Sequence, residues 1–197
     1  NCMRKIIVTQ RENLFKNEMR DSIDIRWSFF LEKCNLFPIL IPNNLNLIRK
    51  YLNNEEYSGI LLTGGGLIAS LGEKSSRDEI EKLLISKSIS DNIPLIGVCR
   101  GMQQIQSYFK IKLKKVEGHV NKKFEIDYQK NKRIINSFHE YGTEDTINEI
   151  KVTSRSTDNI VKSISHRKHK IMGIMWHPER NRPFDHFDIE LFGKFYL

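Results

Sequence analysis

The sequence predicts an α/β fold: a three-layer sandwich with a mostly parallel central sheet. Three observations support this class. Short apolar runs rich in β-branched residues recur along the chain, helical patterns lie between them, and 197 residues suit one compact domain, given about 150 residues per domain. Strands that alternate with helices imply right-handed crossovers, which place parallel strands side by side under helices on both faces.

The first half of the chain supplies the expected parallel strands. Each run is short and almost entirely apolar, which is typical of a strand buried on both faces. The four expected strands are residues 5–8, 38–41, 59–62 and 94–98.

Helical patterns fill the intervals between these runs. The segment 23–36 places Trp27, Phe30 and Leu31 on one side, as an amphipathic helix packed on a sheet requires. The other expected helices are residues 45–52, 78–89, 103–110 and 189–196.

The second half of the chain has a different texture. Short alternating segments at 111–116, 124–128 and 133–135 indicate hairpins or edge strands. Strand character returns at 150–153, 160–164 and 171–175. We find no repeat, low-complexity linker or second domain, so we expect a single domain over residues 3–197. Residues 1–2 are interpreted as an expression scar.

Cysteine usage and hydropathy bear on the compartment. Three cysteines are too few for a disulfide framework, and no paired Cys/His spacing suggests a metal site. We therefore expect a cytoplasmic protein without a metal ion. The uncharged stretch 57–72 contains three consecutive glycines and falls short of a membrane span, so no membrane association is expected.

The charge balance favours anionic ligands without selecting one. Lys and Arg number 32 against 24 Asp and Glu, a net charge of +8. The basic pairs at 114–115 and 122–123 are not interleaved with aromatic residues and match no nucleic-acid-binding motif. We therefore expect a small-molecule ligand and no nucleic acid, and the sequence leaves the oligomeric state open.

Residues 97–101 (GVCRG) carry the main chemical signal. They follow a buried strand and open a helix, which is the context of a nucleophile elbow. Glycines two residues before and after Cys99 let the turn close, and the helix N-terminus favours the thiolate. The competing interpretation is a buried structural cysteine, which is common.

A cysteine nucleophile needs a base, and the base needs an orienting group. Residues 176–179 (WHPE) follow an apolar strand, so His177 is expected at the same sheet edge as Cys99, with Glu179 close enough to fix its tautomer. Four other histidines lack a comparable setting and are interpreted as surface or satisfied groups: His119, His166, His169 and His186.

An oxyanion hole is the third requirement, because attack on an amide carbonyl places negative charge on its oxygen. Residues 62–66 (LTGGG) end a strand with three glycines, whose N–H groups can approach a substrate oxygen. Gly65 or Gly66, together with the N–H of Arg100, is expected to form this hole. A glycine run alone is a weak signal, but it gains weight beside the other two motifs.

These motifs, in this order, resemble the class I (triad) glutamine amidotransferases and their hydrolase relatives. The resemblance rests on residues 97–103, on residues 176–179 and on the glycine run, and it spans essentially the whole chain. It implies a flavodoxin-like fold, a Cys99, His177 and Glu179 triad, a glutamyl-holding Gln103 and no cofactor. A second protein family with a cysteine at a nucleophile elbow usually has His directly after the cysteine. This chain has Arg100 there, which disfavours that family.

Flanking segments resemble the γ-glutamyl hydrolase branch of this family. The resemblance makes Arg77, Asn136, Ser137 and His139 candidates for substrate binding, although Arg77 equally suits a solvated helix start. Where the branch continues with a second His and a Gln, this chain has Glu140 and Tyr141. Two specific activities remain open within this resemblance: a γ-glutamyl-GABA hydrolase, and a glutaminase subunit that donates ammonia to a separate synthase.

Basic residues predict the character of the leaving group. The loop 10–21 follows the first strand, so it belongs on the Cys99 side of the sheet. Arg11 and Arg20 in that loop, and Arg180 after the His-Pro-Glu motif, would suit an anionic, nucleotide-linked leaving group. The alternative interpretation is that these arginines are solvated surface charges.

Overall fold

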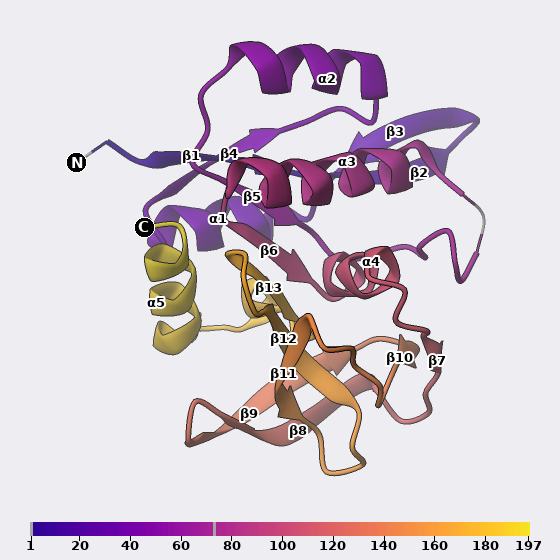
Figure 1. The fold of residues 1–197 in the computed structure, drawn as a ribbon, viewed down its shortest axis with the longest axis vertical. Helices are drawn as coiled ribbons and strands as arrows, with labels where there is room; N and C mark the ends of the chain where they lie inside the picture. Colours follow the sequence, from indigo (N-terminus) through magenta and orange to yellow (C-terminus); the bar gives the residue numbers. More distant parts are fainter. Residues whose placement is uncertain (1, 73) are drawn as a thin grey trace.

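The computed structural model describes residues 2–72 and 74–197 and has a seven-stranded sheet at its centre (Figure 1). Five neighbouring strands are parallel, and the two strands at one edge of the sheet are each antiparallel to the strand beside them. This confirms the predicted α/β class. The strand order is β11 (Ile150–Arg155), β12 (Val161–His166), β13 (Ile171–Ile174), β6 (Leu95–Val98), β5 (Gly59–Leu62), β1 (Arg4–Val8) and β4 (Leu36–Leu40).

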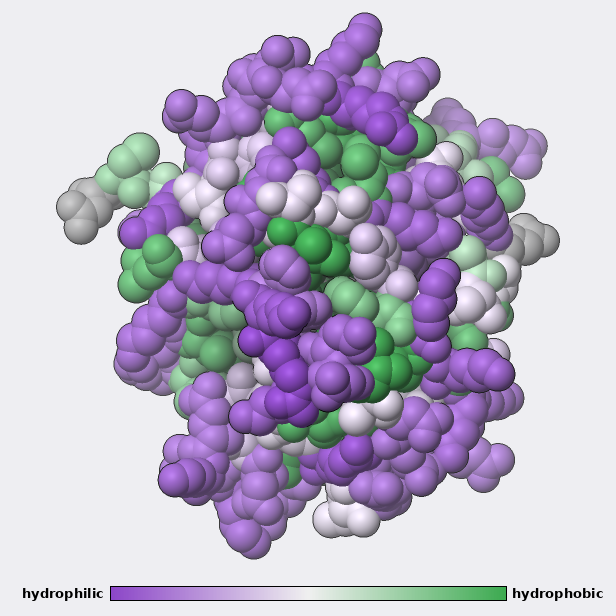
Figure 2. Space-filling view, in the orientation of Figure 1, coloured by the Kyte–Doolittle hydropathy of each residue, from purple (hydrophilic) through white to green (hydrophobic). Residues whose placement is uncertain are grey.

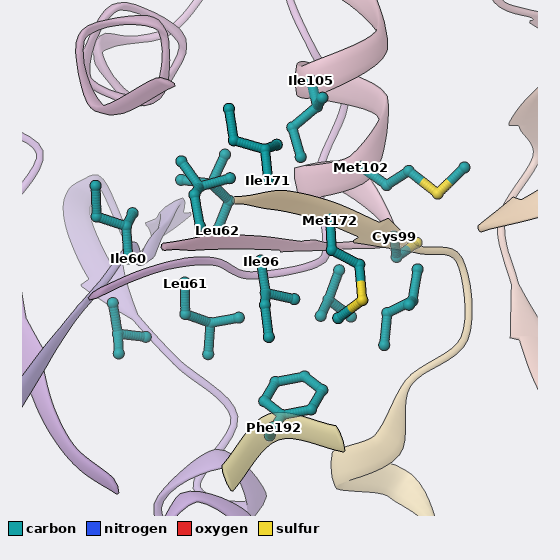
Figure 3. Close-up of a cluster of buried hydrophobic side chains, with 14 of the residues drawn as sticks. Ile60, Leu61, Leu62, Ile96, Cys99, Met102, Ile105, Ile171, Met172 and Phe192 are labelled. Carbon is teal, nitrogen blue, oxygen red and sulfur yellow. The ribbon is translucent and has the colours of Figure 1, made fainter. Parts of the chain in front are cut away.

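Helices cover both faces of the sheet. One face carries α2 (Leu45–Asn54), α3 (Ser76–Asp91) and α4 (Arg100–Tyr108), and the other carries α1 (Arg26–Lys33) and α5 (His186–Phe195) (Figure 1). Figure 3 shows the packing, with Met102 and Ile105 of α4 on one side of the strands and Phe192 of α5 on the other. Figure 2 shows hydrophilic side chains over most of the visible surface, with apolar patches between them.

Local sequence explains where the elements begin. Ser75 and Asp78 form a reciprocal capping box at the start of α3, and Asn44 caps α2 through its side chain. Pro38 lies in β4, which is an edge strand, and so its missing N–H removes no bond within the sheet.

Two hairpins extend beyond what the sequence predicted. The loop expected at 10–21 is instead a hairpin of β2 (Arg11–Phe15) and β3 (Glu18–Ser22). Its two turn residues, Lys16 and Asn17, have φ of 47° and 64°, as a tight hairpin turn requires. The second hairpin, β8 (Val120–Tyr128) and β9 (Asn131–Phe138), is longer than the segments expected there.

The remaining elements are small. A two-stranded ladder pairs β7 (Lys114–Lys115) with β10 (Tyr141–Gly142), and a short 3-10 helix, η1, spans Pro178–Arg180. Within the described residues, no helix has the length and apolar character needed to cross a membrane.

Three connections meet at the carboxyl edge of the parallel strands. Cys99 follows β6, Thr63 follows β5, and Met175 leads from β13 to His177. The parallel register aligns these strand ends, with Val98 opposite Ile174 and Leu62 opposite Gly97. The fold therefore gathers the three sequence motifs at one edge of the sheet.

Candidate active site

Cys99 sits in a strained turn between β6 and α4. Its backbone has φ of 51° and ψ of −104°, a conformation that side-chain-bearing residues rarely adopt. The flanking glycines are required sterically, because a Cβ at Gly97 would lie 2.6 Å from the carbonyl of Gly101, and one at Gly101 would lie 2.2 Å from the Leu62 oxygen. The two glycines therefore let β6, α4 and β5 pack closely around the turn that carries Cys99.

His177 and Glu179 stand beside this cysteine. His177 Nδ1 lies 2.7 Å from Glu179 Oε1. A Cβ at Gly64 would come within 2.6 Å of the His177 ring and 3.4 Å of Cys99 Cβ, so the glycine backbone, the imidazole and the thiol are in close proximity. All three side chains are buried, with 6% of Cys99, 2% of His177 and 1% of Glu179 exposed.

The electrostatics of the three groups favour an ion pair. Burial opposes ionisation of Cys99, but the charge of His177 and a hydrogen bond with it outweigh burial, so the pKa of the thiol is lowered. A backbone hydrogen bond from Arg100 acts in the same direction. For His177, burial is likewise outweighed by the charges of Cys99 and Glu179, which raise the pKa of the imidazole to about 9. Each group therefore shifts the pKa of the other in the direction that favours a thiolate beside an imidazolium.

The glycine segment after β5 is held from behind by two arginines. Gly65 and Gly66 have φ of +86° and +80°. Arg77 donates to the carbonyl oxygens of Thr63 at 2.6 Å and Gly65 at 3.0 Å, and Arg11 donates to that of Gly64 at 3.3 Å. These contacts leave the opposite side of the segment facing Cys99.

A buried charge cluster braces this arrangement. Arg77 and Arg100 pair with Glu81, whose Oε1 is 2.8 Å from Arg77 Nε, and Arg100 also pairs with Asp78 at 2.9 Å. All four side chains are at most 3% exposed. The side chain of Arg100 is therefore occupied within the protein, and its backbone N–H is the group available at the site.

A cavity of about 360 Å³ opens over Cys99. Its wall contains Cys99 and His177 together with apolar and charged side chains. The lining residues are Gly65, Gly66, Leu67, Cys99, Arg100, Gln103, Val120, Phe138, His139, Glu140, Tyr141, His177 and Arg180.

Two of the candidates in the cavity wall have clear local partners. Gln103 Nε2 donates to the Tyr141 carbonyl oxygen at 2.9 Å, and Arg180 lies over the Phe138 ring at 4.4 Å. The same Phe138 ring meets the His177 ring edge-on at 5.8 Å. Arg180 and Phe138 therefore form the wall on the His177 side.

Other predicted substrate-binding residues lie outside this cavity. Asn136 holds the backbone of His177, donating to its carbonyl oxygen at 2.9 Å and accepting from its N–H at 2.8 Å. Ser137 is buried and accepts a hydrogen bond from Lys162 at 3.2 Å. Arg77 is buried and paired with Glu81, so the alternative of a solvated helix start is wrong.

The β2–β3 hairpin changes the expected placement of two arginines. Arg11 packs against Gly64 and Gly65, where it lines a separate cavity of about 160 Å³ behind the glycine segment. Arg20 pairs with Glu18, is half exposed, and lies over the Phe15 ring. Neither lines the cavity over Cys99, because Arg11 is held by the Gly64 carbonyl oxygen and Arg20 by Glu18.

Sequence reasoning missed several wall residues, including Phe138, Val120 and Leu67. It also missed Lys162, which is fully buried although it is charged. A lysine inside the apolar run 160–164 was the available signal. Among the described residues, no group of three or more His, Cys, Asp or Glu side chains is arranged to hold a metal ion.

A family model for class-I glutamine amidotransferases matches residues 30–192. The chain belongs to this family. It is 29% identical over 177 residues to γ-glutamyl-CDP-amidate hydrolase of Campylobacter jejuni, covering 88% of each chain. It is also 24% identical over 174 residues to anthranilate synthase component 2 of Cyanophora paradoxa, covering 81% of this chain and 86% of the relative.

A solved structure supports the same fold. A glutamine amidotransferase from Thermotoga maritima superposes with a TM-score of 0.65 at 14% identity, covering 98% of this chain and 83% of that one.

Proposed function

We propose that this protein hydrolyses a γ-glutamyl amide through a glutamyl thioester on Cys99. The observation that supports the proposal is the buried series of Cys99, His177 and Glu179: the first two line the cavity beside the glycine segment, and Glu179 bonds to His177 from behind. A thiolate paired with an imidazolium is a nucleophile and a proton donor in one unit. Family membership supports the same chemistry.

The reaction proceeds in two halves. The Cys99 thiolate attacks the γ-carbonyl carbon, and the oxyanion accepts hydrogen bonds from the N–H of Arg100 and of Gly65 or Gly66. His177 gives its proton to the departing nitrogen as the C–N bond breaks. Neutral His177 then takes a proton from water, the resulting hydroxide attacks the thioester, and glutamate leaves as the thiolate is restored.

The glutamyl end of the substrate occupies the Gln103 side of the cavity. Gln103 uses one N–H on Tyr141, so its carboxamide oxygen and second N–H can bind the α-ammonium and α-carboxylate groups. Glu140 at the rim adds a negative charge for the ammonium, and His139 forms part of the same wall.

The leaving group exits on the His177 side, because His177 protonates the departing nitrogen. The wall there is Arg180 over Phe138, a cation beside an aromatic face. This suits an anionic leaving group that also carries a ring. We take γ-glutamyl-CDP-amidate as the substrate, released as cytidine diphosphoramidate for capsule phosphoramidate biosynthesis, and the similarity to the Campylobacter jejuni hydrolase supports it.

The second candidate is a glutaminase that delivers ammonia to a separate synthase. Similarity to anthranilate synthase component 2 favours it, as do Leu67 and Val120 at the cavity, which are 47% and 51% exposed and could meet a partner. This candidate predicts glutamine hydrolysis that increases when a synthase is added. A γ-glutamyl-GABA hydrolase would need neither a synthase partner nor a cationic site that binds phosphate.

Specificity constants for three substrates test the proposal. We expect kcat/KM to be higher for γ-glutamyl-CDP-amidate than for γ-glutamyl-GABA or L-glutamine. Arg180→Ala is expected to lower that value by roughly 10- to 100-fold, as loss of a charge-assisted hydrogen bond would. Arg49→Ala, which removes an exposed arginine from α2, is the matched control. Equal or better turnover of γ-glutamyl-GABA would reject the nucleotide substrate, and full activity of Cys99→Ala would reject the mechanism.

A further inference from the structure

A fully buried lysine lies behind the wall of the cavity. Lys162, on β12, is 0% exposed, and its Nζ lies 2.8 Å from His119 Nδ1, 2.8 Å from His139 Nε2 and 3.2 Å from Ser137 Oγ. An ammonium group has three N–H donors and no acceptor. Each of the three neighbouring atoms therefore accepts one hydrogen bond, and the lysine is fully satisfied by neutral partners.

These contacts fix the proton positions on both histidines. Because His139 accepts at Nε2, its proton is on Nδ1, which donates to the Tyr141 carbonyl oxygen at 3.0 Å. Because His119 accepts at Nδ1, its Nε2–H donates to Asp158 at 2.7 Å. Gln103 donates to the same Tyr141 oxygen from the cavity side. A continuous chain of hydrogen bonds thus links Lys162 to the glutamyl end of the cavity.

The charged and titratable groups that face the lysine are few. Among the described residues they are His119 and His139, which flank the β8–β9 hairpin, Asp158 before β12, and Cys99 from the elbow. Burial lowers the pKa of Lys162 to about 8, against the charges of Asp158 and Cys99. Burial and the lysine charge lower the pKa of His139 to about 3. At neutral pH the lysine is charged and His139 is neutral.

A buried ammonium whose direct partners are all neutral is costly, and an apolar side chain would suit this strand better. We propose that Lys162 is a positioning residue, which holds His139 in a single tautomer and so fixes the Tyr141 carbonyl and the Gln103 carboxamide that shape the glutamyl end of the cavity. The identity of that ligand rests on the proposed function. The lysine itself touches no substrate.

Histidine NMR tests the positioning directly and needs no turnover. In wild-type protein labelled with ¹⁵N-histidine, we expect His139 to carry its proton on Nδ1 and to stay neutral well below the usual histidine pKa of about 6.5. In Lys162→Met the donor to Nε2 and the repelling charge are both lost, so His139 should become protonated at Nε2 at a higher pH than in wild type. Lys151→Met removes an exposed lysine from the neighbouring strand β11 and serves as the control.

Two results would overturn the proposal: a wild-type His139 with its proton on Nε2, or a Lys162→Met spectrum in which His139 behaves as in wild type. The first measurement stands even if the variant fails to fold. Kinetics add a second readout, in which Lys162→Met raises KM by roughly tenfold while kcat changes much less, because a displaced positioning group weakens binding. If no γ-glutamyl amide is hydrolysed by either protein, the proposed function fails, while the NMR result still decides the role of Lys162.

Discussion

Asn136 hydrogen-bonds both backbone groups of His177, accepting from the N–H at 2.8 Å and donating to the carbonyl oxygen at 2.9 Å. Asn136 lies on β9, whereas His177 follows β13, so one carboxamide joins the outer hairpin to the sheet edge. The position of the imidazole relative to Cys99 thus depends on a residue that lies outside the cavity.

Asn136→Ala should therefore lower kcat with a smaller effect on KM. We expect a loss of roughly 10- to 100-fold, because small displacements of a catalytic group are expensive. Steady-state kinetics with the preferred γ-glutamyl amide measure it. Asn131→Ala, at the exposed turn of the same hairpin, is the control, and equal effects of the two substitutions would contradict this role.

The pH dependence of kcat/KM should be bell-shaped. Activity rises with pH as Cys99 ionises, at a pKa below that of an ordinary thiol, and falls as His177 loses its proton near pH 9. The negative charge of Glu179 helps to raise the pKa of His177, so Glu179→Gln should move the alkaline limb to lower pH. An alkaline limb that stays in place in Glu179→Gln would assign it to another group.

Gly64→Ala should disable the site by a steric route. The added Cβ would lie 2.6 Å from the His177 ring, which must move away from Cys99. We expect activity to fall by about 100-fold or more, since the nucleophile and its base would separate. Gly118→Asn is a suitable control, because no atom lies within 4 Å of a Cβ at that position and Asn tolerates its φ of +73°. Near-normal activity of Gly64→Ala would show that the ring has room to adjust.

Glu81→Gln should destabilise the fold. The substitution removes the carboxylate that Arg77 and Arg100 share, which leaves Arg100 with Asp78 and leaves buried Arg77 with no carboxylate partner. Breaking a buried pair in this way costs about 3–5 kcal/mol. Urea unfolding monitored by tryptophan fluorescence measures the change. Glu79→Gln, which removes only the partly exposed pairs with Lys74 and Lys82, is the control. Equal midpoints for the two variants would contradict the bracing role.

The sequence predicted the sheet and the helices that cover it, because short β-branched runs and amphipathic periods report burial directly. It also placed Cys99 and His177 at one edge, since both follow parallel strands. The β2–β3 hairpin was not predicted, because both of its strands are largely solvent-exposed and their sequences show no alternation of apolar and polar residues.

The roles of individual polar residues were harder to predict. Asn136 and Ser137 are neighbours on one strand, so their side chains point to opposite faces. One reaches His177 and the other reaches Lys162, and neither lines the cavity over Cys99. A motif places such residues near a site, but only the register of β9 against the sheet decides which contacts they make.

The strained backbone that presents the Cys99 thiol for reaction also lowers the stability of the fold. Glycine would adopt φ of 51° and ψ of −104° at less energetic cost than cysteine, so Cys99→Gly would relieve strain at the very position that bears the thiol. A screen that selects variants only for thermal stability would therefore favour Cys99→Gly, which removes the nucleophile. Engineering of this scaffold for robustness has to hold position 99 constant and seek its gains elsewhere in the fold.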